Sequence, residues 1–142
     1  MTGMTVPSPS ERQWAAIAHV AALVLALCTS WIAGAAGMLG AGIVWFLKRD
    51  ASPFVAAHAR EAFNFNLSMF LYAAIAAVIA FVLVGATVLT LGLGIILAAP
   101  AGIVLAIVIC AVALMWLVCS LIAASRAWNG QPYRYPFTLR LF

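Results

Sequence analysis

Two long stretches without a charged side chain most constrain what this chain can fold into. Residues 13–47 and 62–125 contain no Asp, Glu, Lys or Arg. A soluble globular domain carries about 25% charged residues, whereas only 7% of the 142 residues here are charged and 68% are hydrophobic. Because about 20 apolar residues span a bilayer as a helix, the sequence predicts an all-α, polytopic membrane protein.

Turn and capping signals divide these stretches into four predicted transmembrane helices. Ser8-Pro9-Ser10-Glu11 fits a capping box ahead of the first helix, and Ser52-Pro53 fits another helix start. The predicted spans are about 14–31, 34–47, 64–84 and 95–125. The second is short, so residues 32–47 either cross as a short helix or dip into the membrane and return. We favour a crossing, because the alternative puts basic residues on the wrong face.

The charged residues predict the orientation of the chain. After four crossings the N-terminus, the loop at 48–61 and the C-terminus share one side, which then holds all seven Lys and Arg and all three Asp and Glu. Three crossings would divide them. Since Lys and Arg concentrate in cytoplasmic loops, we predict an N-in, C-in, multi-pass protein of the bacterial inner membrane.

Three segments follow from this reading. We expect a disordered N-terminal tail at 1–9, a four-helix transmembrane domain at 10–128 and an interfacial amphipathic tail at 129–142. Aromatic and basic side chains favour the membrane–water interface. The predicted lipid-interface residues are Trp14, Trp31, Tyr133, Arg134, Tyr135 and Arg140.

A polar stripe marks the start of the third span. On a helical wheel most of its members fall within about a third of the circumference, and such a stripe should face other helices rather than lipid. Glu61 and Arg126 bracket the uncharged run, and we predict that they form an ion pair between the third and fourth spans. Asn66 lies off the stripe and receives no role. The candidate helix-packing residues are His19, His58, Glu61, Asn64, Ser68, Tyr72 and Arg126.

The sequence offers little that points to catalysis or to a cofactor. His19, inside the first span, is either a proton-relay or ligand residue or a histidine bonded to a neighbouring helix. His58 and Glu61 could share a metal, but no third ligand is marked. The three cysteines lie in apolar runs without a CxxC spacing and suit packing. We therefore predict no catalytic residues, no metal and no cofactor, and a protein that is not an enzyme.

The order of the motifs resembles a known family. The segments concerned are Ser52-Pro-Phe, His58-Ala-Arg-Glu-Ala-Phe-Asn-Phe and Ala127-Trp-Asn-Gly-Gln-Pro-Tyr-Arg-Tyr-Pro. They resemble small bacterial four-helix membrane proteins of unknown function that are similar to the twenty-kilodalton subunit of the chloroplast inner-envelope import translocon. The resemblance implies a four-helix integral membrane fold and little about activity, because import belongs to the plastid relatives.

Two functions fit these features. The first is a small scaffold or accessory subunit whose charged face docks a partner. The alternative is an oligomeric conduit or carrier, with a polar path formed by His19, His58, Glu61 and Asn64; a lipid-modifying enzyme using His58 and Glu61 is a weaker third. The expected partners are the lipid bilayer and a membrane protein or second copy. We expect no nucleic acid, because the basic residues form no stripe.

Overall fold

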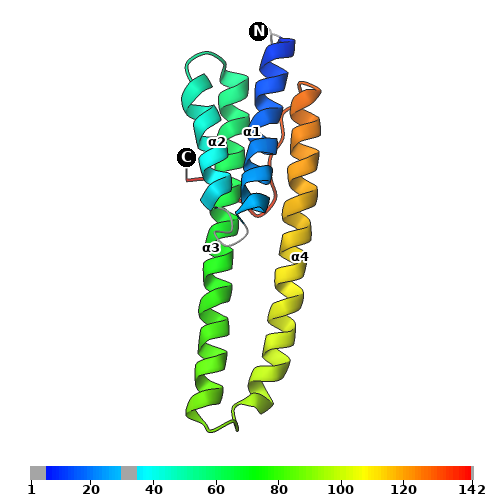
Figure 1. Ribbon diagram of the computed structural model, residues 1–142. Coiled ribbons are helices and arrows are strands. Elements are labelled where there is room, and N and C mark those ends of the chain that lie inside the picture. Colours follow the sequence, from blue (N-terminus) through cyan, green and yellow to red (C-terminus); the bar gives the residue numbers. More distant parts are fainter. Residues whose placement is uncertain (1–5, 30–34, 142) are drawn as a thin grey trace. The chain divides into compact units, whose positions relative to one another are not determined.

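The computed structural model describes residues 6–29 and 35–141, and the regular structure in that part of the chain is helical. Its helices are α1 (Pro9–Cys28), α2 (Ala35–Lys48), α3 (Pro53–Leu89) and α4 (Ile95–Trp128) (Figure 1). By length and composition α1, α3 and α4 could each cross a membrane, whereas α2 is a shorter apolar helix. The predicted all-α fold with a short second helix is confirmed.

The helix ends follow from local chemistry. Ser8 caps α1: its Oγ accepts a hydrogen bond from the Glu11 amide at 3.3 Å, and Glu11 Oε2 accepts one from the Ser8 amide at 2.7 Å. This is the predicted capping box, which satisfies two amides at the helix start. At the end of α4, Gly130 adopts a φ of 73°, and the Gln131 amide bonds the Arg126 carbonyl at 2.9 Å. This pattern is typical of a helix closed by glycine.

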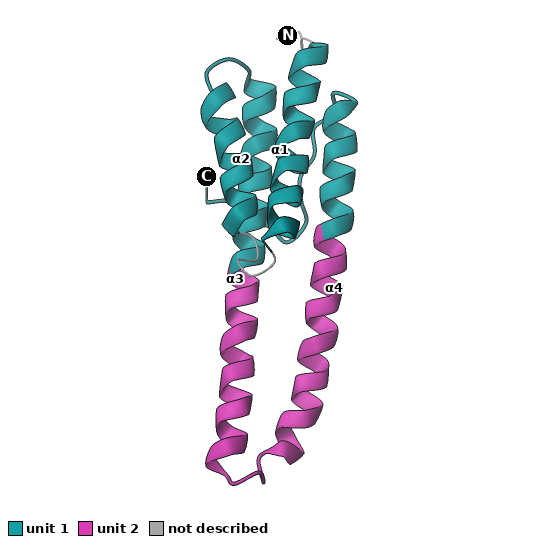
Figure 2. Cartoon of the chain, in the orientation of Figure 1, with its two compact units in different colours: residues 1–70, 117–142 teal, residues 71–116 magenta. Residues whose placement is uncertain are grey.

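The chain divides into two compact units (Figure 2). One comprises Met1–Phe70 and Leu117–Phe142, and the other comprises Leu71–Trp116. All seven Lys and Arg and all three Asp and Glu belong to the first, which we call the charged unit. The second, called the hairpin unit, has none.

Small side chains form the core of the charged unit. Its main cluster consists of Ala15, Ala16, Ala18, Val44, Val55, Ala59 and Ala127. Between membrane helices, small residues allow the backbones to approach closely. Gly37 is such a position, because a methyl group there would collide with the Asn66 carboxamide and lie 3.1 Å from the Ala22 carbonyl oxygen.

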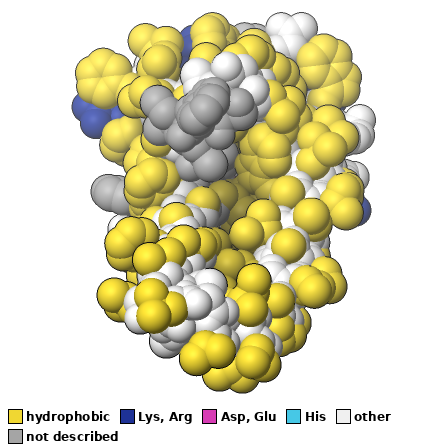
Figure 3. Space-filling model, turned by 60° about the horizontal axis from the view of Figure 1, so that its bottom comes forward, with side chains coloured by type: hydrophobic (Ala, Val, Ile, Leu, Met, Phe, Trp, Pro, Cys, Tyr) yellow, Lys and Arg dark blue, Asp and Glu magenta, His cyan; other side chains and the backbone are white. Residues whose placement is uncertain are grey.

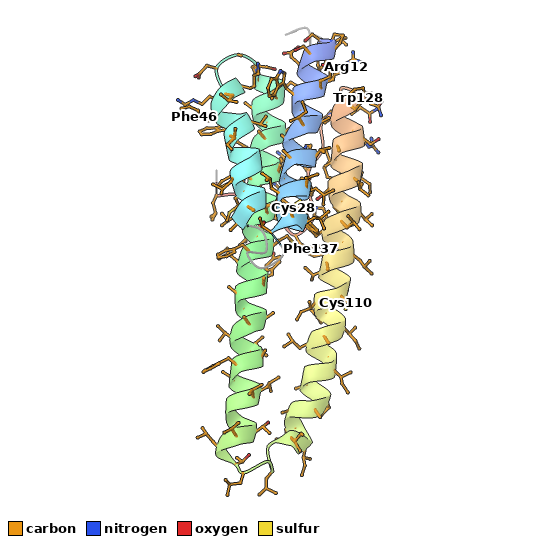
Figure 4. All side chains as sticks on the ribbon, in the orientation of Figure 1. Arg12, Cys28, Phe46, Cys110, Trp128 and Phe137 are labelled. Carbon is orange, nitrogen blue, oxygen red and sulfur yellow. The ribbon has the colours of Figure 1, made fainter. Side chains whose placement is uncertain are left out.

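The ends of four helices meet in the charged unit. The Ser52 hydroxyl donates to Glu11 Oε1 at 2.6 Å, and the Lys48 ammonium lies 4.3 Å from the centre of a Trp14 ring. These contacts join the start of α1 to the end of α2 and to the start of α3, so the antiparallel α1 and α2 return the chain to the end where it began (Figure 1). Arg12 lies against Gly130, and Figure 4 shows Arg12 and Trp128 at this same end.

The hairpin unit has the surface of a segment that lies in lipid. None of residues 71–116, all of them described, is fully buried, and large apolar side chains such as Phe81 face outward. Its turn uses positive φ at Leu91 and Gly92. Apolar side chains of the two legs line an open groove of about 510 Å³, and hydrophobic side chains dominate the face toward the turn (Figure 3). Such a surface requires hydrocarbon around it.

Candidate functional site

The C-terminal tail, residues 131–141, is bonded to α3 inside the charged unit. The Leu139 amide donates to Ser68 Oγ at 2.9 Å, and the Leu141 amide donates to Asn64 Oδ1 at 3.2 Å. Ser68 and Asn64 are both buried. Their side chains supply acceptors to an irregular segment whose amides have no helix or strand to bond.

Glu61 holds the same tail with both carboxylate oxygens. Oε1 accepts a hydrogen bond from Arg140 Nε at 3.0 Å in an ion pair, and Oε2 accepts one from the Tyr135 amide at 3.4 Å. The Glu61 side chain is 16% exposed and that of Arg140 is 43% exposed. The pair is therefore partly shielded from water, which makes it stronger than a fully exposed pair.

A buried chain of hydrogen bonds links the tail to α1 and α3. The Tyr135 hydroxyl lies 2.9 Å from His19 Nδ1, and His19 Nε2 lies 2.9 Å from His58 Nδ1. Tyr135, His19 and His58 are all at most 3% exposed. The Tyr135 ring also stacks on Phe65, with centroids 3.9 Å apart. The tail is thus part of the core of the charged unit.

The histidine tautomers decide which atom donates in each contact of this chain. If the Tyr135 hydroxyl donates to His19 Nδ1, then His19 donates to His58 Nδ1 and the His58 proton lies on Nε2; the reverse order leaves that nitrogen without a proton. Burial raises the pKa of the Tyr135 phenol above its ordinary range, so the hydroxyl remains a donor at physiological pH.

Nε2 of His58 is the last atom of this hydrogen-bonded chain. It is buried beside the Gln131 backbone and makes no well-formed hydrogen bond to the described residues. His58 lines a cavity of about 330 Å³ together with Arg60, Arg134 and Arg140. The buried network therefore ends at a basic pocket.

The predicted ion pair between Glu61 and Arg126 is wrong. Glu61 pairs with Arg140 of the tail, and the Arg126 guanidinium donates to Gln131 Oε1 at 2.8 Å instead. Arg126 is exposed. A helical hairpin brings two helix ends close together, but the folded-back tail supplies a cation with better access to Glu61.

The lipid-interface assignment of Tyr135 is also wrong, because its ring and hydroxyl are buried among α1, α3 and α4. Arg140 binds Glu61 rather than being free for lipid phosphates. Tyr133 is partly buried, Arg134 is exposed and Trp14 packs beside the alanine core, so for these three the assignment stays a prediction. Trp31 lies outside the described residues.

The structure brings most, but not all, residues of the predicted polar stripe into one hydrogen-bonded network. His19, His58, Glu61, Asn64 and Ser68 all belong to the network in the charged unit. Tyr72 is partly exposed and belongs to the hairpin unit.

Sequence reasoning missed Asn66, which is 1% exposed and donates from Nδ2 to the Ala62 carbonyl at 2.9 Å. The signal that could have found it is Gly37. A glycine in an apolar helix indicates a close approach, and here the approaching group is the Asn66 carboxamide.

The chemistry available to this site is hydrogen bonding and charge pairing. Among residues 6–29 and 35–141, no group of three or more His, Cys, Asp and Glu side chains is placed to hold a metal ion. The two histidines bond to each other, and the carboxylate is occupied by the tail. The side chains that remain able to bind another molecule are those of the basic pocket.

Comparison with known proteins gives the family. Searches of curated proteins and of solved structures found no match. A profile of the magnetosome magnetite crystal formation proteins matches residues 10–142. This match agrees with the predicted bacterial membrane protein, whereas the resemblance to the plastid translocon subunit receives no support. The chain belongs to this family, the MamF/MmsF proteins.

Proposed function

We propose that this protein takes part in magnetite crystal formation as a non-enzymatic membrane scaffold or accessory subunit. Family membership supports the process. The observation that carries the role is the distribution of charge: every Lys, Arg, Asp and Glu belongs to the charged unit, and the hairpin unit is bare. The hairpin would anchor the protein in lipid, and the charged unit would present the groups that bind other molecules.

We place the protein in the bacterial inner membrane or the magnetosome membrane, with the charged unit toward the cytosol. The excess of basic residues at the helix ends supports this orientation. The charged unit would dock a membrane-protein partner or a second copy. Exposed charges at the turn between α2 and α3, including Arg49 and Asp50, offer a surface for such docking.

A conduit is the second candidate, because a buried chain of His19, His58 and Tyr135 could carry protons. We rank it lower, since the side chains that would line a path bond to the tail instead. Purified protein in liposomes with a pH-sensitive dye inside tests this alternative. Proton flux above that of empty liposomes would reverse our ranking.

The proposal is tested by deleting the gene from a magnetite-forming bacterium that carries it and restoring it on a plasmid. We expect altered crystal size or number by electron microscopy, restored by the full chain. A chain with Lys48→Gln, Arg49→Gln and Asp50→Asn should restore less, while the hairpin control Val82→Leu should restore fully. Immunoblots check that all chains reach equal levels. Unchanged crystals in the deletion strain would contradict the proposal.

A further inference from the structure

A pocket in the charged unit gathers basic side chains from α3 and the tail. Its volume is about 330 Å³. Three arginines and one histidine line it, against one carboxylate: Arg60, Arg134, Arg140, His58 and Glu61. The pocket is therefore positively charged.

Two of the three guanidinium groups are uncommitted. Arg140 binds Glu61 and the Tyr135 carbonyl. Arg60 and Arg134, both exposed, make no hydrogen bond or ion pair with other described residues. After the Glu61 carboxylate is balanced by Arg140, the lining keeps two positive charges and their N–H donors.

His58 lies beside these arginines and reports on the pocket. It is 3% exposed and lines the same pocket, with its Nε2 shielded from solvent beside the Gln131 backbone. An anion held by the arginines would therefore change the surroundings of the His58 ring without having to contact Nε2.

We propose that this pocket binds a phosphate-bearing anion through Arg60 and Arg134. A guanidinium matches phosphate geometry with two parallel hydrogen bonds. The tetrahedral group also offers acceptor oxygens in several directions, as arginines from two separate segments require, whereas a carboxylate has two oxygens in one plane. The phosphate could belong to an anionic phospholipid headgroup or be free in solution.

The test measures binding to the full-length protein in a zwitterionic detergent without phosphate. Inorganic phosphate and short-chain phosphatidic acid are titrated separately, and ¹⁵N-histidine spectra are followed. We expect saturable binding that shifts the ring resonances of His58, which lines the pocket, more than those of His19. The Arg60→Gln, Arg134→Gln double variant should bind roughly tenfold more weakly or worse, while the matched control Arg49→Gln should bind normally.

Melting temperatures confirm that the variants are folded, which is expected because the substituted arginines are exposed. Saturation by phosphatidic acid alone would assign the pocket to lipid headgroups, and saturation by inorganic phosphate as well would assign it to phosphate from solution. Both support the proposal. No binding of either probe, equal affinity for acetate, or undiminished binding by the double variant would overturn it.

Discussion

Glu61 joins α3 to the C-terminal tail through both of its carboxylate oxygens. We expect Glu61→Gln to lower the free energy of unfolding in detergent by roughly 1 kcal/mol, because it removes the ion pair and weakens the bond to the tail. Thermal unfolding followed by circular dichroism measures the loss.

The matched control is Asp50→Asn, which removes an ion pair whose carboxylate side chain is 91% exposed. Its effect should stay within about 0.5 kcal/mol. Arg140→Gln should reproduce the Glu61→Gln loss, and the double variant should cost less than the sum of the two. Additive losses would show that the two side chains do not act as a pair.

The tyrosines of the tail predict how stability depends on pH. Burial raises the pKa of Tyr133 to about 12, and burial also raises the pKa of Tyr135. In the unfolded chain these phenols ionise near pH 10, before they do so in the folded protein, and their ionisation favours the unfolded state. The contribution of the two neutral phenols to the stability of the folded protein is therefore fully present below pH 10 and is lost as the pH rises toward 12. Urea unfolding at pH 8 to 12 should show this decline, and Tyr133→Phe with Tyr135→Phe should flatten it. An equally steep decline in that variant would refute the assignment.

At the scale of single residues, contacts between near neighbours could be predicted from the sequence and contacts between distant residues could not. The capping residues Ser8 and Glu11 were predictable, because their bonds span three residues. The bond from His19 to Tyr135 was not, because it joins residues 116 positions apart. An aromatic and basic tail suits a membrane interface as well as a protein core, and helical periodicity says nothing about an extended segment.

At the scale of helices, the position of α2 depends on glycine. Gly37→Ala should lower the free energy of unfolding by about 1–3 kcal/mol, because the new methyl group overlaps the buried Asn66 carboxamide. Gly102→Ala is the control: nothing lies within 4 Å of its added methyl group, and alanine favours a helix. Thermal melts in one detergent compare the two. Equal losses would mean that α2 is not packed as described.

The elements themselves were largely predictable, while their packing was not. Long uncharged runs and start signals such as Ser52-Pro53 indicated four helices, and α3 does begin at Pro53. The length of α3 exceeds the predicted span 64–84 at both ends, because nothing in the sequence interrupts the helix. The rotation that faces His58 toward His19 depends on contacts between distant segments, which one sequence does not reveal.

At the scale of the whole molecule, the charged unit contains every Lys, Arg, Asp and Glu, and the hairpin unit contains none. The hairpin legs at 71–89 and 95–116 are each about 30 Å long as helices, close to the thickness of the hydrocarbon core. The antiparallel α1 and α2 return the chain to its starting end, as the contact between Ser52 and Glu11 shows. The prediction that all charges lie on one side of the membrane therefore does not depend on whether this pair crosses the bilayer.

The most direct measurement of this arrangement is labelling by a membrane-impermeant maleimide. Cys28, Cys110 and Cys119 are first replaced by serine, and single variants Asp50→Cys and Leu93→Cys are then expressed in spheroplasts. We predict that position 93, in the turn of the hairpin, is labelled from outside, and that position 50 is labelled only after the membrane is permeabilised. Labelling of both positions from the same compartment would contradict the account.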